Sequence, residues 1–172
     1  KFNDLKFKKK NDNQYKLSGN EFDAQLMISN YLKVENTNNI FERFENINSK
    51  ILLQFNNIFL DKNSKLTDLF GEISVNGKKV NTAEISSKIN NKNDFSLSIK
   101  TNSKDEKITN LLIEEPEPFI KNFKFIKGFK EGKLSYGSIK KNDRTISNLK
   151  IYDFKVKEVP ILAKLLTLAS LQ

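Results

Sequence analysis

Three glutamates lie close together in the chain, at Glu114, Glu115 and Glu117. A pair of carboxyl groups can hydrolyse a glycosidic bond, one acting as general acid and the other as nucleophile or base. These three glutamates, however, flank Pro116 and Pro118, and proline in the first turn is typical of the start of a helix. Negative charge is favoured there by the helix dipole. We therefore interpret these carboxylates as helix-start residues and assign no catalytic residue.

Other catalytic and metal-binding groups are missing from the sequence, which contains no histidine and no cysteine. A Ser-His-Asp or Cys-His arrangement is therefore impossible within this chain, and so is a disulfide or thiolate metal site. The aspartates Asp61, Asp68 and Asp105 do not have the spacing of a metal-binding loop. We expect a protein that is not an enzyme and that carries no metal and no cofactor.

The charge of the chain points first to an anionic partner, because 30 lysines and arginines exceed 21 acidic residues and give a net charge of +9. Only Arg43 and Arg144 are arginines, the residue type that reads guanine edges and clamps phosphates. The 14 phenylalanines fall mainly at apolar strand and helix positions, not between the lysines. We therefore interpret the lysines as a solvated face and expect no nucleic-acid partner.

Apolar and polar residues alternate along most of the chain, which predicts β-strands. The clearest run has Phe95, Leu97 and Ile99 on one side and serines and a lysine on the other. Asn76-Gly77 predicts a hairpin turn. The predicted strands cover residues 15–19, 47–55, 69–75, 79–89, 95–101, 108–113, 132–139 and 146–156. We expect an antiparallel meander that forms a curved, groove-like, U-shaped sheet, or alternatively a β-sandwich, since periodicity alone does not separate the two.

Three short helices interrupt or follow the strands in this interpretation. Asn20 is expected to cap a helix that reaches about Leu32, and Pro116 and Pro118 open a second one that ends at Lys127-Gly128. The third, over 159–171, begins at Pro160 and is apolar almost all round.

Such an apolar helix must lie against an apolar sheet face, a membrane surface or a continuation of the chain. At about 1.5 Å per residue it is too short to span a bilayer, which needs about 20 residues. We expect it to pack on the edge or mouth of the sheet through Ile161, Leu162, Leu165, Leu166, Leu168 and Ala169. Since no capping glycine or polar tail follows it, we expect the sequence to be a piece of a longer protein.

The terminal stretch also carries a sequence pattern, namely Asp153-Phe154, Val156, Pro160, Leu162-Ala163, Leu165-Leu166 and Leu168-Ala169-Ser170-Leu171. This pattern resembles a signature of the AsmA-like family, the YhdP- and TamB-related bridge-like lipid-transfer proteins of Gram-negative bacteria. Residues 17–24 and 119–134 resemble two further steps of that family, so that the resemblance covers about 15–172. The family's Gly-rich turn, its later strands and its N-terminal membrane anchor are not in this sequence.

The resemblance implies a location and a function. Residues 1–172 would be a single segment of a periplasmic β-groove, near the C-terminal part of a parent protein that is anchored in the inner membrane. Its apolar face would bind phospholipid acyl chains and support lipid transport between inner and outer membrane, with other envelope proteins as further partners. The candidate groove residues are Ile51, Leu53, Phe55, Ile73, Val75, Phe95, Leu97, Ile99, Leu134 and Tyr136.

An alternative function is a non-enzymatic structural or protein-interaction module of the envelope, without bound lipid. In that case the same ten residues would form an ordinary closed core. A groove instead leaves a large exposed apolar patch, which ordinary monomers avoid.

Overall fold

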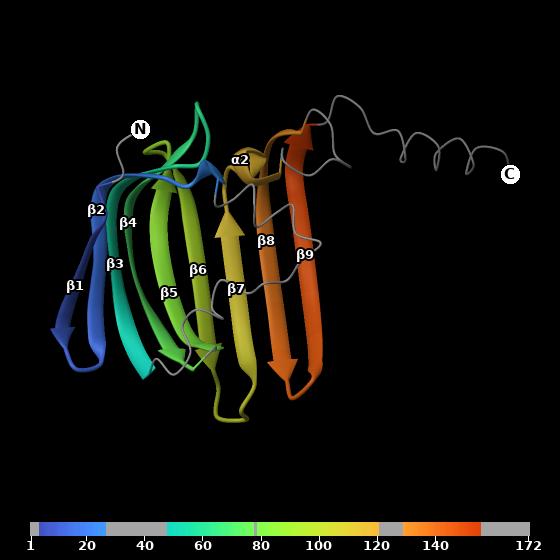
Figure 1. Cartoon of the computed structure of the whole chain (residues 1–172). Helices are drawn as coiled ribbons and strands as arrows, with labels where there is room; N and C mark the ends of the chain where they lie inside the picture. The colour runs from blue at the N-terminus through green and yellow to red at the C-terminus, as the bar shows by residue number, and fades with distance from the viewer. Residues whose placement is uncertain (1–3, 27–47, 78, 121–128, 156–172) are drawn as a thin grey trace, which may run out of the picture.

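The computed structural model describes residues 4–26, 48–77, 79–120 and 129–155. Nine strands lie side by side in one sheet, in the order in which they occur along the chain (Figure 1). They are β1 (Lys6–Asn11), β2 (Gln14–Asp23), β3 (Asn48–Phe59), β4 (Lys65–Asn76), β5 (Lys79–Ile89), β6 (Asn93–Thr101), β7 (Lys107–Ile113), β8 (Lys130–Lys141) and β9 (Arg144–Lys155). A short helix, α2 (Glu117–Ile120), follows β7 at one end of the sheet.

The sheet is mixed, because β2 and β3 run parallel while every other neighbouring pair is antiparallel. A parallel pair needs a crossover connection of a dozen or more residues, and the chain uses 24–47 for it. The predicted meander is therefore confirmed from β3 to β9 and wrong between β2 and β3. The predicted fold class, a mainly β, curved and open sheet, is confirmed. The sandwich alternative is wrong for the described part of the chain, whose nine strands form one sheet.

Two irregularities bend β4. Asp68 adopts a positive φ of 52°, and the register with β5 shifts between Thr67 and Phe70. A second shift lies between Ser74 and Val75. Such bulges bend a strand and increase its twist. The first one also explains why Leu66 and Leu69, which lie three residues apart, are both buried.

The turn between β4 and β5 was predicted from Asn76-Gly77. Asn76 pairs with Lys79, so Gly77 is the first of two loop residues, and its φ of 58° suits a residue without a side chain. The predicted return strand over 79–89 is confirmed as β5. Asn76 itself belongs to β4 and not to the loop.

The predicted helices fare differently. Asn20 caps no helix, since it lies within β2, which pairs with β3 as far as Asp23 and Phe59. The ladder uses the backbone groups that a helix start at Asn20 would need. Helical residues begin only at Gln25, whose N–H donates to the Asp23 carboxylate at 3.1 Å, and the predicted helix beyond Leu26 lies outside the described residues. The helix predicted at Pro116 is present as α2, and the Pro116 carbonyl accepts the N–H groups of Phe119 and Ile120 at 3.0 Å. The remainder of that helix and the predicted terminal helix lie outside the described residues.

The core lies on one face of the sheet, toward the end that carries α2. Its centre is Ile89, which is fully buried. Ile120 of α2 and Phe129, just before β8, contribute from outside the strands. The buried members of the cluster are Phe55, Leu60, Leu66, Leu69, Ile89, Ile113, Ile120, Phe129 and Leu134.

Candidate functional site

The ten candidate groove residues all lie on the same face of the sheet. In-register partners share a face and every second residue of a strand returns to it, so the pairing pattern decides the question. Leu53 and Leu97 lie in one row that crosses the sheet through Gly71 and Ile85. Three rows contain all the candidates except Val75, namely Ile51–Ile73–Ala83–Ile99, Leu53–Gly71–Ile85–Leu97–Leu111–Tyr136 and the row of Phe55 and Leu69 with Phe95, Ile113 and Leu134. Val75, two residues beyond Ile73, joins the same face.

The burial of this apolar face changes along the strands. Phe55, Val75 and Leu134 are buried, with exposed fractions of 5%, 5% and 8%. The other seven candidates, Leu97 among them, are half-buried. No second sheet packs on this face within the described residues. The face is thus a tightly packed core near α2 that opens into a half-buried apolar surface across the middle of the sheet.

Sequence reasoning missed several members of this face. Ile85 and Leu111 lie in the same row as Leu97, and Leu17 on β2 extends that row toward β1. All three follow the same period of two as the chosen residues. Continuing the alternation through every strand would have found them.

Polarity also changes along the length of this face. On β7 the residues that point to it are Ile113, Leu111, Thr109 and Lys107, in order from the α2 end. On β8 the same levels hold Leu134, Tyr136, Ser138 and Lys140. The face therefore passes from apolar through hydroxyl-bearing to cationic side chains within one strand length.

Tyr136 marks the boundary between the apolar and the hydroxyl-bearing parts. Its hydroxyl shares a hydrogen bond of 3.2 Å with Ser147 of β9. Contacts with the hydroxyls of Ser138 and Ser147 lower the pKa of the Tyr136 phenol. A tyrosine suits such a boundary, since its ring is apolar and its tip is polar.

The opposite face is mostly polar and carries cross-strand ion pairs, although Phe70, Leu112, Ile139 and Ile146 are exposed on it. Lys50 lies 3.2 Å from Glu72, and Lys100 lies 3.0 Å from Glu84. Exposed pairs of this kind contribute little stability individually. They nevertheless give Lys50 and Lys100 nearby carboxylates.

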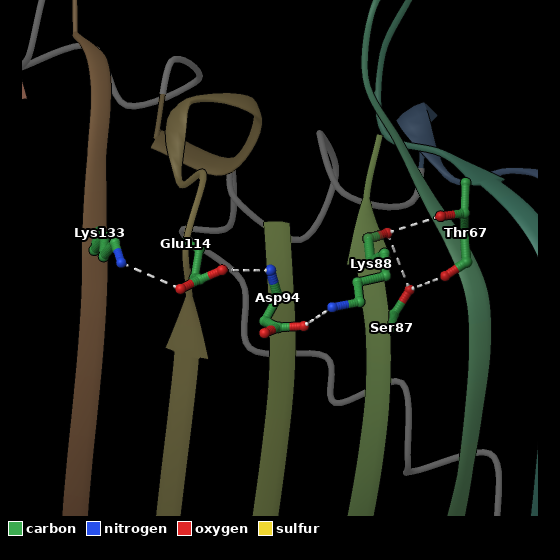
Figure 2. A network of polar contacts seen from close by, with 6 residues as sticks. All are labelled: Thr67, Ser87, Lys88, Asp94, Glu114 and Lys133. Atoms are coloured by element: carbon green, nitrogen blue, oxygen red, sulfur yellow. Dashed lines mark hydrogen bonds and ion pairs between the residues drawn. The ribbon is translucent and has the colours of Figure 1, made fainter. Parts of the chain in front are cut away.

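A longer network of polar contacts runs from β8 to β4 near the α2 end (Figure 2). Glu114 is its centre, accepting the Asp94 backbone N–H at 2.8 Å and the Lys133 ammonium at 3.2 Å. The Asp94 carboxylate in turn accepts the Lys88 ammonium at 2.5 Å. The network joins Lys133, Glu114, Asp94, Lys88, Ser87 and Thr67.

Glu114, Glu115 and Glu117, the acidic residues considered above for glycosidic hydrolysis, have structural roles. The Asp94 N–H, followed by Lys133, lowers the pKa of Glu114. A general acid of a glycosidase needs the opposite shift. Glu115 accepts the amide of Asn93 at 2.8 Å and thereby holds the β5–β6 turn. Glu117 lies in the first turn of α2, as the sequence predicts.

The described residues contain no group of three or more histidine, cysteine, aspartate or glutamate side chains that could hold a metal ion. Within the same residues, no helix has both the length and the apolar character needed to cross a membrane. The six apolar residues proposed for terminal-helix packing, Ile161, Leu162, Leu165, Leu166, Leu168 and Ala169, lie outside these ranges.

Two hollows among the described residues are each lined by a single groove candidate, Phe95 in one and Val75 in the other. One of about 510 Å³ lies at the end of β3 and β4 away from α2. Val75 is the only groove candidate that lines it, and its other lining residues are polar, among them Ser49, Asn76 and Asn81. Neither of these two hollows extends along the apolar face of the described strands.

Comparisons of the chain with protein-family models, with curated proteins and with solved structures found no match.

Proposed function

We propose that the chain binds phospholipid acyl chains on its apolar face. The observation that carries the proposal is the placement of all ten candidate residues on one face of an open, single sheet. Burial of each methylene of an acyl chain is favourable by about 0.8 kcal/mol. A continuous apolar surface can therefore hold a lipid tail without any specific polar contact.

In this proposal the chain is a segment of an AsmA-like protein. The terminal pattern from Asp153 to Leu171 suggests the family, and the open, one-sided sheet suits it. The setting would be the periplasm, with the parent protein anchored in the inner membrane and lipid moving between the two membranes. The chain would act by binding and guiding lipid, not by catalysis.

The experiment is native mass spectrometry of the full chain, purified in mild detergent, followed by lipid extraction. We compare Leu97→Lys with Ser98→Lys, since the two residues are neighbours on β6 that point to opposite faces. We expect the unsubstituted chain and the Ser98→Lys variant to carry phospholipid, and the Leu97→Lys variant to carry none. Far-UV circular dichroism monitors the sheet in each variant. Lipid loading that survives charges at Leu97, Ile99 and Leu53 would overturn the proposal.

A second candidate function is a protein-interaction module, which the exposed side chains of β9 favour. Ile146 and Leu149 are 78% and 59% exposed, and within the described residues β9 pairs only with β8. Such an edge can accept an added strand from a partner. This alternative predicts a lipid-free mass together with strong hydrogen-exchange protection across the apolar face.

A further inference from the structure

The end of the apolar face that lies away from α2 carries two lysines, and a third lies near them. Lys107 of β7 and Lys140 of β8 are in-register partners, so their side chains leave the sheet on the same face. The Lys107 ammonium donates a hydrogen bond to the carbonyl of Val80, at the start of β5. Lys79, the residue before Val80, pairs with Asn76 and so belongs to the opposite face, but its charge still acts on Lys107. We name Lys107, Lys140 and the nearby Lys79 the basic end.

The basic end lacks the carboxylates that accompany some of the other lysines of the sheet. Lys141, next to Lys140 but on the other face, lies 3.5 Å from Glu106. Among the described residues, no acidic side chain forms an ion pair with Lys79, Lys107 or Lys140. Burial, followed by the charges of Lys140 and Lys79, lowers the pKa of Lys107. An anion placed among the three lysines would relieve this repulsion.

The distance from the core to the basic end matches one lipid tail. From Ile113 to Thr109 on β7 is about 13 Å and to Lys107 about 20 Å, at about 3.3 Å per residue. An acyl chain in one leaflet covers about 15 Å, half of a hydrocarbon core of about 30 Å. A tail that starts beside Ile113 and Leu134 would thus end near Thr109 and the hydroxyl of Tyr136, one step short of the lysines.

We propose that the basic end binds the phosphate of a phospholipid whose tails lie lengthwise along β6, β7 and β8. This inference rests on the proposed function, to which it adds the position and direction of the bound lipid. The hydroxyl level of Thr109, Ser138 and Ser147 would face the polar glycerol and ester region. Lysine suits the last position, because it binds phosphate as a compact point charge with three donors.

The test measures binding of two ligands with the same tails to the full chain. One is dioctanoyl phosphatidylglycerol and the other is dioctanoylglycerol, which lacks the phosphate. The variant is Lys107→Gln with Lys140→Gln. The matched control is Lys8→Gln with Lys150→Gln, which removes the same charge from exposed positions on β1 and β9 outside the basic end.

We expect the Lys107→Gln/Lys140→Gln variant to bind the phospholipid at least about tenfold more weakly, which corresponds to the loss of about one charge-assisted contact. Its affinity for dioctanoylglycerol should be unchanged, and the control should behave as the parent chain. Because the substitutions are polar and lie at strand ends, the variant should fold, and circular dichroism verifies this.

The outcomes separate the two proposals. Equal phospholipid affinity in the variant and in the unsubstituted chain would overturn the proposal that the basic end binds phosphate. It would leave the proposal of acyl-chain binding on the apolar face intact. Failure of the parent chain to bind either ligand overturns the proposed function itself. Competition by glycerol phosphate at concentrations similar to those of the phospholipid would identify a site for free phosphate and overturn the lipid assignment.

Discussion

Lys107 and Lys140 lie directly opposite each other on β7 and β8, so that two positive side chains are held side by side on one face. Like charges in this position destabilise a sheet by up to about 1 kcal/mol. We expect Lys140→Gln to raise the free energy of unfolding by about 0.5 kcal/mol at low salt, and by less at high salt. Urea denaturation measures this change. Lys150→Gln, opposite Ser135, should have no such effect, and a loss of stability in Lys140→Gln would contradict the prediction.

Glu114 should make stability depend on pH in the acid range. The hydrogen bond from Asp94 N–H, followed by Lys133, lowers the folded-state pKa of Glu114 below its value in the unfolded chain. The stabilisation is therefore complete above the unfolded pKa and is lost as the pH falls through the folded one.

Thermal unfolding of Glu114→Gln, compared with the parent chain between neutral and acid pH, tests this sign. The variant should be less stable at neutral pH, and the difference should shrink as the pH falls. Lys133→Gln removes only the second cause of the lowered pKa of Glu114, so this variant should lose only part of the pH-dependent stabilisation. A constant difference between Glu114→Gln and the parent at all pH values would show that the carboxylate is not the cause.

Gly71 allows two strands to approach closely on the apolar face. A Cβ there would lie 2.6 Å from the Glu84 carbonyl oxygen and 3.0 Å from the Ile85 Cα, both of which are backbone atoms. Gly71→Ala should therefore destabilise the chain by about 1–3 kcal/mol, the usual cost of overpacking. At Gly137 of β8 the nearest atom to an added Cβ is the Asn110 side-chain oxygen, at 3.6 Å. Gly137→Ala should be neutral or slightly stabilising, and equal effects of the two substitutions would argue against the close approach.

Ile89 should be among the most sensitive core positions. It has no exposed surface, and truncation to alanine leaves a cavity that costs about 2–5 kcal/mol. Ile146 on β9 is 78% exposed, and its truncation should change stability by no more than about 0.5 kcal/mol. Urea denaturation of Ile89→Ala and Ile146→Ala measures the contrast. A change below about 1 kcal/mol at Ile89 would place the core elsewhere.

The strands were predictable because the alternation of side chains is a local property. Phe95, Leu97 and Ile99 have one phase within β6, and the structure retains it. The shared face of the ten candidates follows from the same phase in each strand. Alternation gives no strand direction, however, so it does not predict that β2 and β3 pair in parallel. The Asn20 cap failed for a related reason, since pairing with β3 extends β2 through the proposed helix start.

The basic end could not have been found from the sequence. Lys107 and Lys140 belong to different strands, and only the register of β7 with β8 makes them partners. A register shifted by one residue would place Lys141 opposite Lys107 instead. The network likewise depends on contacts of Glu114, just after β7, with Asp94 of β6 and Lys133 of β8. Helix-start chemistry explains Glu117, whereas the roles of Glu114 and Glu115 arise from strands that the sequence places far from them.

The parallel junction between β2 and β3 has a consequence for the order of folding. From β3 to β9 each strand pairs with the next one along the chain, and such local contacts form quickly. The β1–β2 hairpin can dock only after the longer connection over 24–47 has closed. We therefore expect this hairpin to dock last and to open first, as one cooperative unit. Amide hydrogens of β1 and β2 would then exchange together, ahead of those in β4. In the partly open state, the edge of β3 that pairs with β2 would have unpaired backbone groups.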